Sequence, residues 1–165
     1  MRTGEYRFLT IWRIEAPLDA VWSAVHDAGG WPRWWRNVEA VSEIEPGDAQ
    51  GVGALHRYTW KGVLPYRLTF DVRVTRIEPQ ALLEGSVTGA LAGTGRWQFS
   101  RENGVTVVRY EWRVETQQRW MNLLAPLARP LFRWNHDAVM REGGIAIAGL
   151  LGARVAGIEQ RMLSD

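Results

Sequence analysis

One stretch near the end of the chain, residues 119–144, places polar side chains in a segment of helical character. His136 has the clearest capacity for chemistry there, because an imidazole with a pKa near neutrality can take up and release a proton. At helical spacing, Phe132, His136, Met140, Gly143 and Ile147 fall on one stripe. Buried polar groups cost free energy unless they are satisfied, so this stripe indicates the wall of a cavity for a largely apolar molecule rather than a closed core.

Three interpretations of His136 remain open at this stage. It is a satisfied core or surface histidine, a ligand contact, or a catalytic group that moves a proton. Its neighbours Asn135 and Asp137 must point elsewhere, since adjacent helical residues do not share a face, which excludes a triad made within the helix. Gly143 and Gly144 each cost about 1 kcal/mol relative to alanine in a helix, so a close approach to the sheet or to a ligand is expected there.

Aromatic residues on alternating strand positions form the rest of the predicted site. On the strand at 52–60, His56, Tyr58 and Trp60 alternate with Arg57, and the sequence leaves open which face looks inward. Glu84 and Arg96 raise the same question, as an inward polar anchor or as surface charge. The residues predicted to contact a ligand are Tyr58, Trp60, Tyr66, Phe70, Trp97, Tyr110, Trp112, Phe132, His136, Met140 and Gly143.

The elements that must position these residues follow from the periodicity. A strand at 6–14 is followed by a short amphipathic helix at 18–27 and a helical turn at 31–36, and then the period changes to two. Asn103-Gly104 is the strongest hairpin signal. A broken or kinked segment around Pro126 and Pro130 leads into a straighter helix from about Leu131. The later strands are expected at 38–45, 52–60, 65–77, 81–88, 92–101 and 104–116.

Composition narrows the class of protein. The 165 residues fit one domain, 1–165, whose tail after about 153 we expect to be loose, and the absence of cysteine excludes disulfides and a thiol nucleophile. The net charge of +2 is scattered, so we predict no nucleic-acid partner. No metal signature, nucleotide motif or cleavable signal is visible, and we predict no cofactor, a cytoplasmic location, and a monomer or homodimer.

Three segments resemble the START-like, or helix-grip, superfamily and its polyketide cyclase/dehydrase and lipid-transport group. They are the strand-to-helix opening at 14–22, the second short helix at 31–35, and the C-terminal helix at 122–144. The resemblance implies an α+β fold in which a curved antiparallel sheet of about six or seven strands wraps around a long C-terminal helix, with two short helices after the first strand. Such a fold hosts carriers, receptors and enzymes, so it does not settle the function.

The leading hypothesis is a binder of a hydrophobic small molecule, such as a lipid, quinone, polyketide or other aromatic, held between the sheet and the C-terminal helix. One alternative is an enzyme of the cyclase/dehydrase kind, in which His136 or a cavity Tyr or Arg transfers a proton; convergent hydrogen-bonding groups in the cavity would favour it. A second alternative is a docking module, because residues 120–134 place an apolar run with tryptophan at both ends beside Arg129 and Arg133, which suits transient contact with a membrane surface or a partner.

Overall fold

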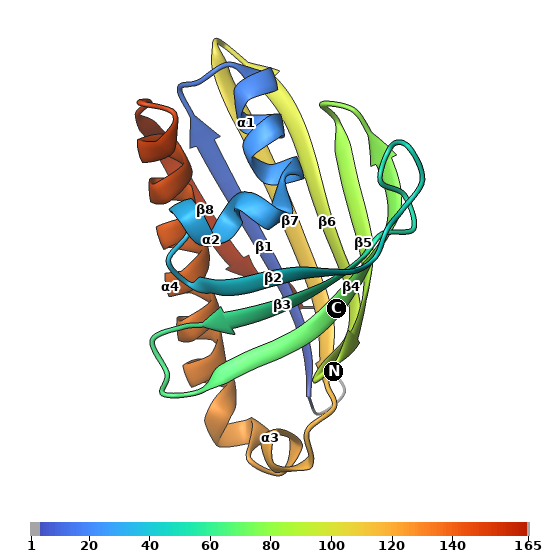
Figure 1. Cartoon of the computed structure of the whole chain (residues 1–165). Helices are drawn as coiled ribbons and strands as arrows, with labels where there is room; N and C mark the ends of the chain where they lie inside the picture. Colours follow the sequence, from blue (N-terminus) through green and yellow to red (C-terminus); the bar gives the residue numbers. More distant parts are fainter. Residues whose placement is uncertain (1–3, 165) are drawn as a thin grey trace.

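A single curved sheet organises the chain. The computed structural model describes residues 4–164 and shows an eight-stranded antiparallel sheet in the order β2-β3-β4-β5-β6-β7-β1-β8 (Figure 1). The strands are β1 Glu5–Ile14, β2 Val38–Glu45, β3 Leu55–Lys61, β4 Arg67–Glu78, β5 Leu82–Gly89, β6 Leu91–Glu102, β7 Val105–Thr116 and β8 Val155–Met162.

Helices cover the concave face of this sheet. A long helix, α4 (Ala125–Leu150), packs along it on one side, and the short helices after β1 close it near the other end (Figure 1). The short elements are α1 Leu18–His26, the 3-10 turn η1 Ala28–Gly30, α2 Trp31–Trp34 and, just before α4, α3 Arg119–Leu123. This is the helix-grip α+β architecture that the sequence predicted.

The alternation in the sequence places the inner face correctly. In β7, Val108, Tyr110, Trp112 and Val114 face the concave side, as their spacing predicted. The turn between β6 and β7 also follows the sequence signal: Asn103 and Gly104 have φ angles of 52° and 79°, and both lie in the left-handed region that a two-residue hairpin of this kind requires.

The C-terminal tail differs from the prediction. Residues 155–162, which we expected to be loose, form β8 and pair with β1 from Phe8↔Met162 to Ile14↔Val155. The sheet therefore has eight strands instead of six or seven. On this strand Gln160 faces α4 and donates a 2.6 Å hydrogen bond to the carbonyl of Asp137. A polar inward residue of this kind blurs the alternation, which is why the pattern did not reveal the strand. Residues 1–3 and 165 of the predicted domain lie outside the described residues.

The break before the long helix comes earlier than predicted. It falls at Leu124, between α3 and α4, and α4 then continues without interruption through Pro130. Pro126 occupies the first turn, where backbone N–H groups have no helical partner in any case. The N–H that Pro130 lacks would have bonded to the carbonyl of residue 126. Residue 126 is exposed, so water can take the place of the missing hydrogen bond to its carbonyl.

Candidate functional site

A cavity lies between the sheet and the first half of α4. Its volume is about 120 Å³. Nine of the eleven predicted contacts line it: Trp60, Tyr66, Phe70, Trp97, Tyr110, Trp112, Phe132, His136 and Met140. The remaining lining residues, which the prediction did not name, are Tyr6, Phe8, Trp35, Gly62, Leu68, Leu91, Val114, Thr116, Met121, Asn135 and Val139. We call this the helix cavity.

A larger cavity adjoins it under the short helices. It has a volume of about 650 Å³, and residues 25–29, Trp31 and residues 46–51 border it together with strands β2 to β7. Tyr58, one of the two predicted contacts absent from the helix cavity, lines this one. We call it the outer cavity. Five residues line both cavities, and all are aromatic: Trp60, Phe70, Trp97, Tyr110 and Trp112.

These five side chains form an aromatic wall that runs along both spaces. Trp97 and Tyr110 stack with ring centroids 4.0 Å apart and an interplanar angle of 25°. Tyr110 also stacks on Trp112, and Phe70 leans against Trp112 at 5.4 Å. Aromatic faces of this kind offer large rigid contact areas to a flat ligand on either side.

The structure shows which face of β3 looks inward, a question that the sequence left open. His56, Tyr58 and Trp60 look inward, whereas Arg57 lies outside and pairs with Asp71 at 2.8 Å. Burial lowers the pKa of His56 and Glu43 partly offsets the effect.

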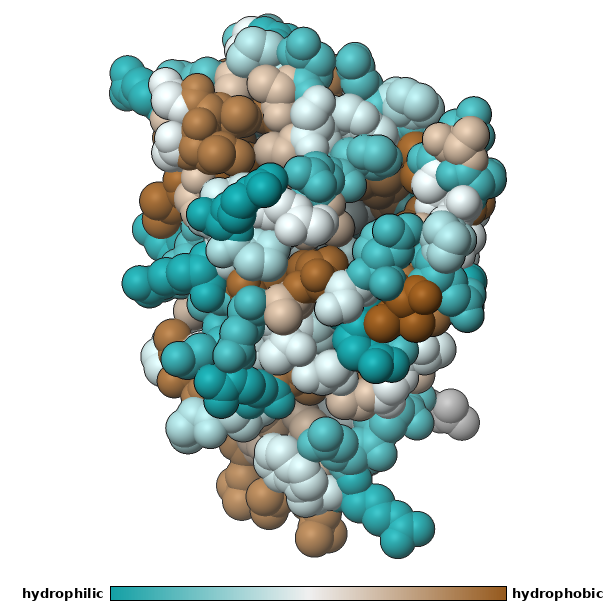
Figure 2. Space-filling view, viewed as in Figure 1, coloured by the Kyte–Doolittle hydropathy of each residue, from teal (hydrophilic) through white to brown (hydrophobic). Residues whose placement is uncertain are grey.

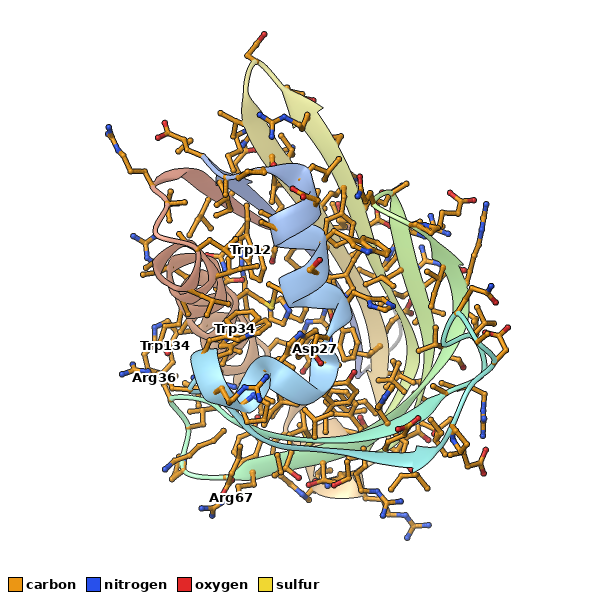
Figure 3. All side chains as sticks on the ribbon, turned by 45° about the horizontal axis from the view of Figure 1, so that its top comes forward. Trp12, Asp27, Trp34, Arg36, Arg67 and Trp134 are labelled. Carbon is orange, nitrogen blue, oxygen red and sulfur yellow. The ribbon has the colours of Figure 1, made fainter. Side chains whose placement is uncertain are left out.

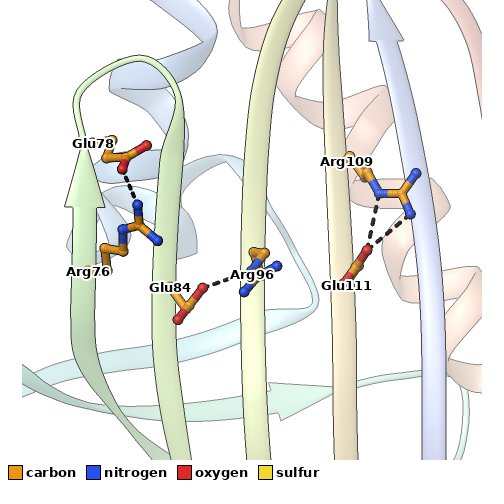
Figure 4. A network of polar contacts seen from close by, with 6 residues as sticks. All are labelled: Arg76, Glu78, Glu84, Arg96, Arg109 and Glu111. Carbon is orange, nitrogen blue, oxygen red and sulfur yellow. Dashed lines mark hydrogen bonds and ion pairs between the residues drawn. The ribbon is translucent and has the colours of Figure 1, made fainter.

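The charged pair that was a candidate anchor belongs to the outer face. Glu84 and Arg96 pair at 2.7 Å beside the Arg109–Glu111 pair on the convex side of the sheet (Figure 4). Both are partly exposed, so they form surface ion pairs rather than a polar anchor inside the helix cavity.

His136 lies inside the helix cavity with both ring nitrogens unsatisfied. Its ring stacks on Phe8 at 4.0 Å and 13°. Nδ1 lies 3.6 Å from Oδ1 of Asp137, which is too long for a hydrogen bond, and Nδ1 and Nε2 are buried without a partner among the described residues. Burial lowers the pKa of His136, and Asp137 only partly opposes this shift. The imidazole is therefore neutral near pH 7, with one nitrogen as donor and the other as acceptor.

Other polar groups also face the cavities without partners. The Tyr6 hydroxyl and the Trp60 Nε1 are buried and have no hydrogen-bond partner among the described residues. Burial raises the pKa of Tyr6, although Arg129, over the Tyr6 ring at 4.9 Å, acts in the opposite direction. The pKa values of Tyr66 and Tyr110 are likewise raised, chiefly by burial. These hydroxyls keep their protons at neutral pH and are available as donors.

Asn135 has a structural task at the cavity rim. Its Oδ1 accepts hydrogen bonds from the backbone N–H groups of Val63 and Leu64, at 2.8 and 3.1 Å. It therefore fastens the loop between β3 and β4 to α4. The sequence indicated that Asn135 points away from His136 and allowed it to reach the mouth of the cavity, which it lines. The bond to a loop 71 residues distant leaves no local signal.

Gly143 lies outside both cavities. A Cβ at Gly143 would overlap the indole of Trp35, and a Cβ at Gly144 would come within 2.9 Å of Trp12 Nε1. Trp12 Nε1 donates to the Met140 carbonyl at 2.9 Å, and Trp35 Nε1 donates to the Val139 carbonyl at 3.1 Å. Gly143 is thus a packing residue where the indoles meet α4. Figure 3 shows Trp12 among the inner side chains, whereas Arg36, Arg67 and Trp134 point outward.

Two of the lining residues that the sequence analysis missed, Tyr6 and Phe8, do carry a signal in the sequence. Tyr6 and Phe8 share the inward face of β1 with Trp12 and Ile14, at a strict period of two. The same alternation that marked β4 and β7 could have placed them in the cavity. Among residues 4–164, no group of His, Asp and Glu is arranged to hold a metal ion.

The family follows from comparison with known sequences. Residues 14–141 match the profile of the polyketide cyclase / dehydrase and lipid transport family, and the chain belongs to that family. A search among curated proteins finds no match.

Solved structures of the same fold include three informative neighbours. The di-domain aromatase/cyclase BexL from the BE-7585A biosynthetic pathway has a TM-score of 0.73 at 22% identity over 92% of this chain and 52% of its own, so the chain spans about half of it. The Zhui aromatase/cyclase from Streptomyces sp. R1128 has a TM-score of 0.70 at 14% identity over 90% and 94% of the two chains. A START superfamily protein from Mycobacterium smegmatis has a TM-score of 0.70 at 11% identity over 88% and 97%.

Proposed function

We propose that the protein binds an uncharged, largely apolar small molecule whose one polar group bonds to His136 in the helix cavity. The observation that carries this proposal is the contrast between His136 and its surroundings. Its two ring nitrogens are buried and unpartnered, and no Asp, Glu, Lys or Arg lines the helix cavity among the described residues. An unsatisfied buried polar group costs about 1–3 kcal/mol, which a ligand hydroxyl or carbonyl would recover.

The charge of the ligand follows from the same lining. A carboxylate placed beside a neutral imidazole would be buried without a counter-ion, which is strongly unfavourable. The outer cavity offers no counter-ion either, because its lining includes the acidic residues Asp27, Glu43 and Asp48 and no described Lys or Arg. An alcohol, phenol, ketone or quinone fits this site, and a fatty acid does not.

The size of the ligand is bounded by the two cavities. About 120 Å³ accommodates the polar end and little more, whereas the outer cavity offers about 650 Å³. Since sites for drug-sized ligands occupy roughly 300–1,000 Å³, a ligand with its body against the aromatic wall fits the combined space. Trp97 and Tyr110 are the residues on which a flat ring system would stack.

A matched ligand pair tests the proposal. We expect 2-naphthol to bind and 2-naphthoate, which has the same ring system with a charged group, to bind more weakly, as measured by titration calorimetry. His136→Phe keeps the stacking on Phe8 and removes the hydrogen bond, so naphthol binding should weaken about three- to tenfold. Equal binding of both ligands, or unchanged naphthol binding by His136→Phe, would contradict the proposal.

Thr10→Val is the matched control. The Thr10 hydroxyl is also buried without a partner among the described residues, but it lines neither cavity. Its removal should leave naphthol binding unchanged. Native mass spectrometry of the freshly purified protein adds an independent measurement, since an uncharged apolar ligand retained through purification would support the same assignment and a carboxylate would oppose it.

The second candidate function is a cyclase or dehydrase reaction in the same cavity. It is favoured by the neutral base at His136 together with tyrosine hydroxyls that keep their protons, and by the family to which the chain belongs. His136 would remove a proton from a CH₂ group between two ketones. The resulting carbanion would attack another carbonyl carbon, whose oxygen would take a proton from a tyrosine before water is lost.

This second candidate is tested by turnover rather than by affinity. Incubation with a linear poly-β-ketone should give a cyclised product lighter by one water, detected by mass spectrometry, and His136→Phe should abolish the acceleration. If the protein binds the ketone but product forms no faster than in buffer, the enzymatic function is refuted and only the binding function remains.

A further inference from the structure

One end of the molecule carries a cluster of large apolar side chains that point into solvent. Leu123 and Leu127 are 82% and 83% exposed, and four neighbours are about half exposed. We call the six residues Trp120, Leu123, Leu124, Leu127, Leu131 and Trp134 the tip. Figure 2 shows the resulting brown surface at the lower end of the molecule, where α3 and the start of α4 lie in Figure 1.

The tip is not a consequence of loosely packed helices. The opposite faces of the same two helices pack against the rest of the protein. Met121 of α3 is 4% exposed and lines the helix cavity, and Phe132 of α4 packs edge-on against Tyr6 and Tyr66. Both helices are therefore apolar on two faces, one inside and one outside. An apolar outer face next to an occupied inner face marks a surface that something else covers.

The charge around the tip is positive. Residues 119–134 contain Arg119, Arg129 and Arg133 and no acidic residue. Arg119 is exposed, Arg129 lies over the Tyr6 ring, and Arg133 is half exposed and 3.7 Å from Asp137. Three cations beside exposed leucines, with tryptophan at each end, combine the apolar and basic features of segments that bind anionic lipid interfaces.

The shape of the tip favours a lipid surface over a second protein. Leu123 and Leu127 lie on different helices on either side of the break at Leu124. Their side chains are 82% and 83% exposed, and neither lines the helix cavity or the outer cavity. A projecting, basic and apolar end inserts into a fluid interface without needing a complementary partner surface. Among residues 4–164, no helix is long and apolar enough to cross a membrane.

We propose that the tip docks the protein reversibly on anionic lipid bilayers. The proposal is independent of the ligand assigned above, because it concerns the outer face of α3 and α4. It does place the helix cavity next to the bilayer, since Met121 and Tyr66, which line that cavity, lie beside the tip residue Trp120.

Vesicle co-sedimentation tests the docking. We expect the protein to sediment with phosphatidylcholine vesicles that contain phosphatidylserine at low salt, and less at high salt because the electrostatic attraction is screened. The double variant Leu123→Ser/Leu127→Ser should lose binding by at least about tenfold, since two large apolar side chains no longer insert. Arg119→Gln should weaken binding about fivefold.

The matched control is Ile145→Ser/Leu150→Ser. These residues are each 51% exposed at the other end of α4, far along the helix from the tip, and their replacement should leave vesicle binding unchanged. All four positions are exposed, so circular dichroism and urea unfolding should show parent-like folding in both double variants.

Three outcomes would overturn the proposal. They are no binding of the parent protein to the anionic vesicles at low salt, equal loss in the tip and control variants, and a dimer in light scattering that becomes a monomer in Leu123→Ser/Leu127→Ser without any vesicle binding. The last outcome would assign the tip to a second copy of the chain.

Discussion

Replacing Gly143 by alanine tests how tightly α4 is held against the two buried indoles. A Cβ at this position would overlap the Trp35 ring and come within 3.0 Å of Trp12 Cζ2. The rings cannot simply move away, because each indole nitrogen is bonded to an α4 carbonyl one turn earlier. Trp12 and Trp35 are both 1% exposed, so there is no open space to receive them.

The expected size of the effect comes from opposing contributions. Overpacking a filled core costs about 1–3 kcal/mol. A strained or broken indole hydrogen bond adds about 1 kcal/mol for each of the two. The better helix propensity of alanine returns about 1 kcal/mol. The free energy of unfolding should therefore fall by roughly 2–4 kcal/mol. Urea unfolding followed by circular dichroism at 222 nm measures this change.

Gly149→Ala in the same helix provides the matched control. Nothing lies within 4 Å of a Cβ built there, so the substitution should raise stability by up to about 1 kcal/mol through propensity alone. If Gly143→Ala proves as stable as the parent while Gly149→Ala is stabilised, the close contact between α4 and the indoles is refuted. A stabilisation of both variants to the same extent would refute it more directly.

Two further predictions concern the cavity residues. Burial lowers the pKa of His136 below its usual 6.5, so as the pH falls the histidine is protonated in the unfolded chain before it is protonated in the folded protein. The free energy of unfolding therefore falls as the pH drops below 6.5. His136→Phe should flatten that part of the pH–stability curve, and an unchanged slope would contradict the burial of the ring. Asn135→Ala should lower the free energy of unfolding by about 1–3 kcal/mol and speed amide hydrogen exchange at Val63 and Leu64, because both N–H groups lose their acceptor. Leu55 on β3, distant from this loop, serves as the reference. If the substitution speeds exchange at Val63 and Leu64 no more than at Leu55, the role of Asn135 in fastening the loop is refuted.

The sequence predicted most of the sheet because the alternation is strong where one face is buried. β7 is the clearest example, with charged residues at every outward position from Arg109 to Arg113. The prediction from alternation failed at β8, where the inward face carries the polar residue Gln160, which donates a hydrogen bond to a carbonyl of α4. The sequence analysis also placed the helix break too late. A proline inside a helix leaves one carbonyl of the preceding turn without its N–H partner, and the sequence does not show whether water can reach that carbonyl.

The candidate site was only partly readable. Spacing brought Phe132, His136 and Met140 to one helical stripe, and the structure places all three on the helix cavity. Spacing could not show that Gly143, on the same stripe, lies beyond the cavity against Trp35. Nor could it show that five aromatic residues line two adjoining spaces, since that depends on ring orientations set by long-range contacts such as Trp97 with Tyr110.

The attachment of α4 is uneven along its length. The indole bonds and the glycine contacts all fall between Val139 and Gly144, whereas the helix cavity extends from there under the preceding turns, along His136 and Phe132. The turns of α4 before Asn135, whose Oδ1 is bonded to the loop between β3 and β4, can therefore lift from the sheet while the later turns stay fixed. Such partial openings cost less than global unfolding. The residence time of a bound ligand should then follow the local opening rate of residues 125–134, and mutations that change the melting temperature through the fixed half should leave it unaltered.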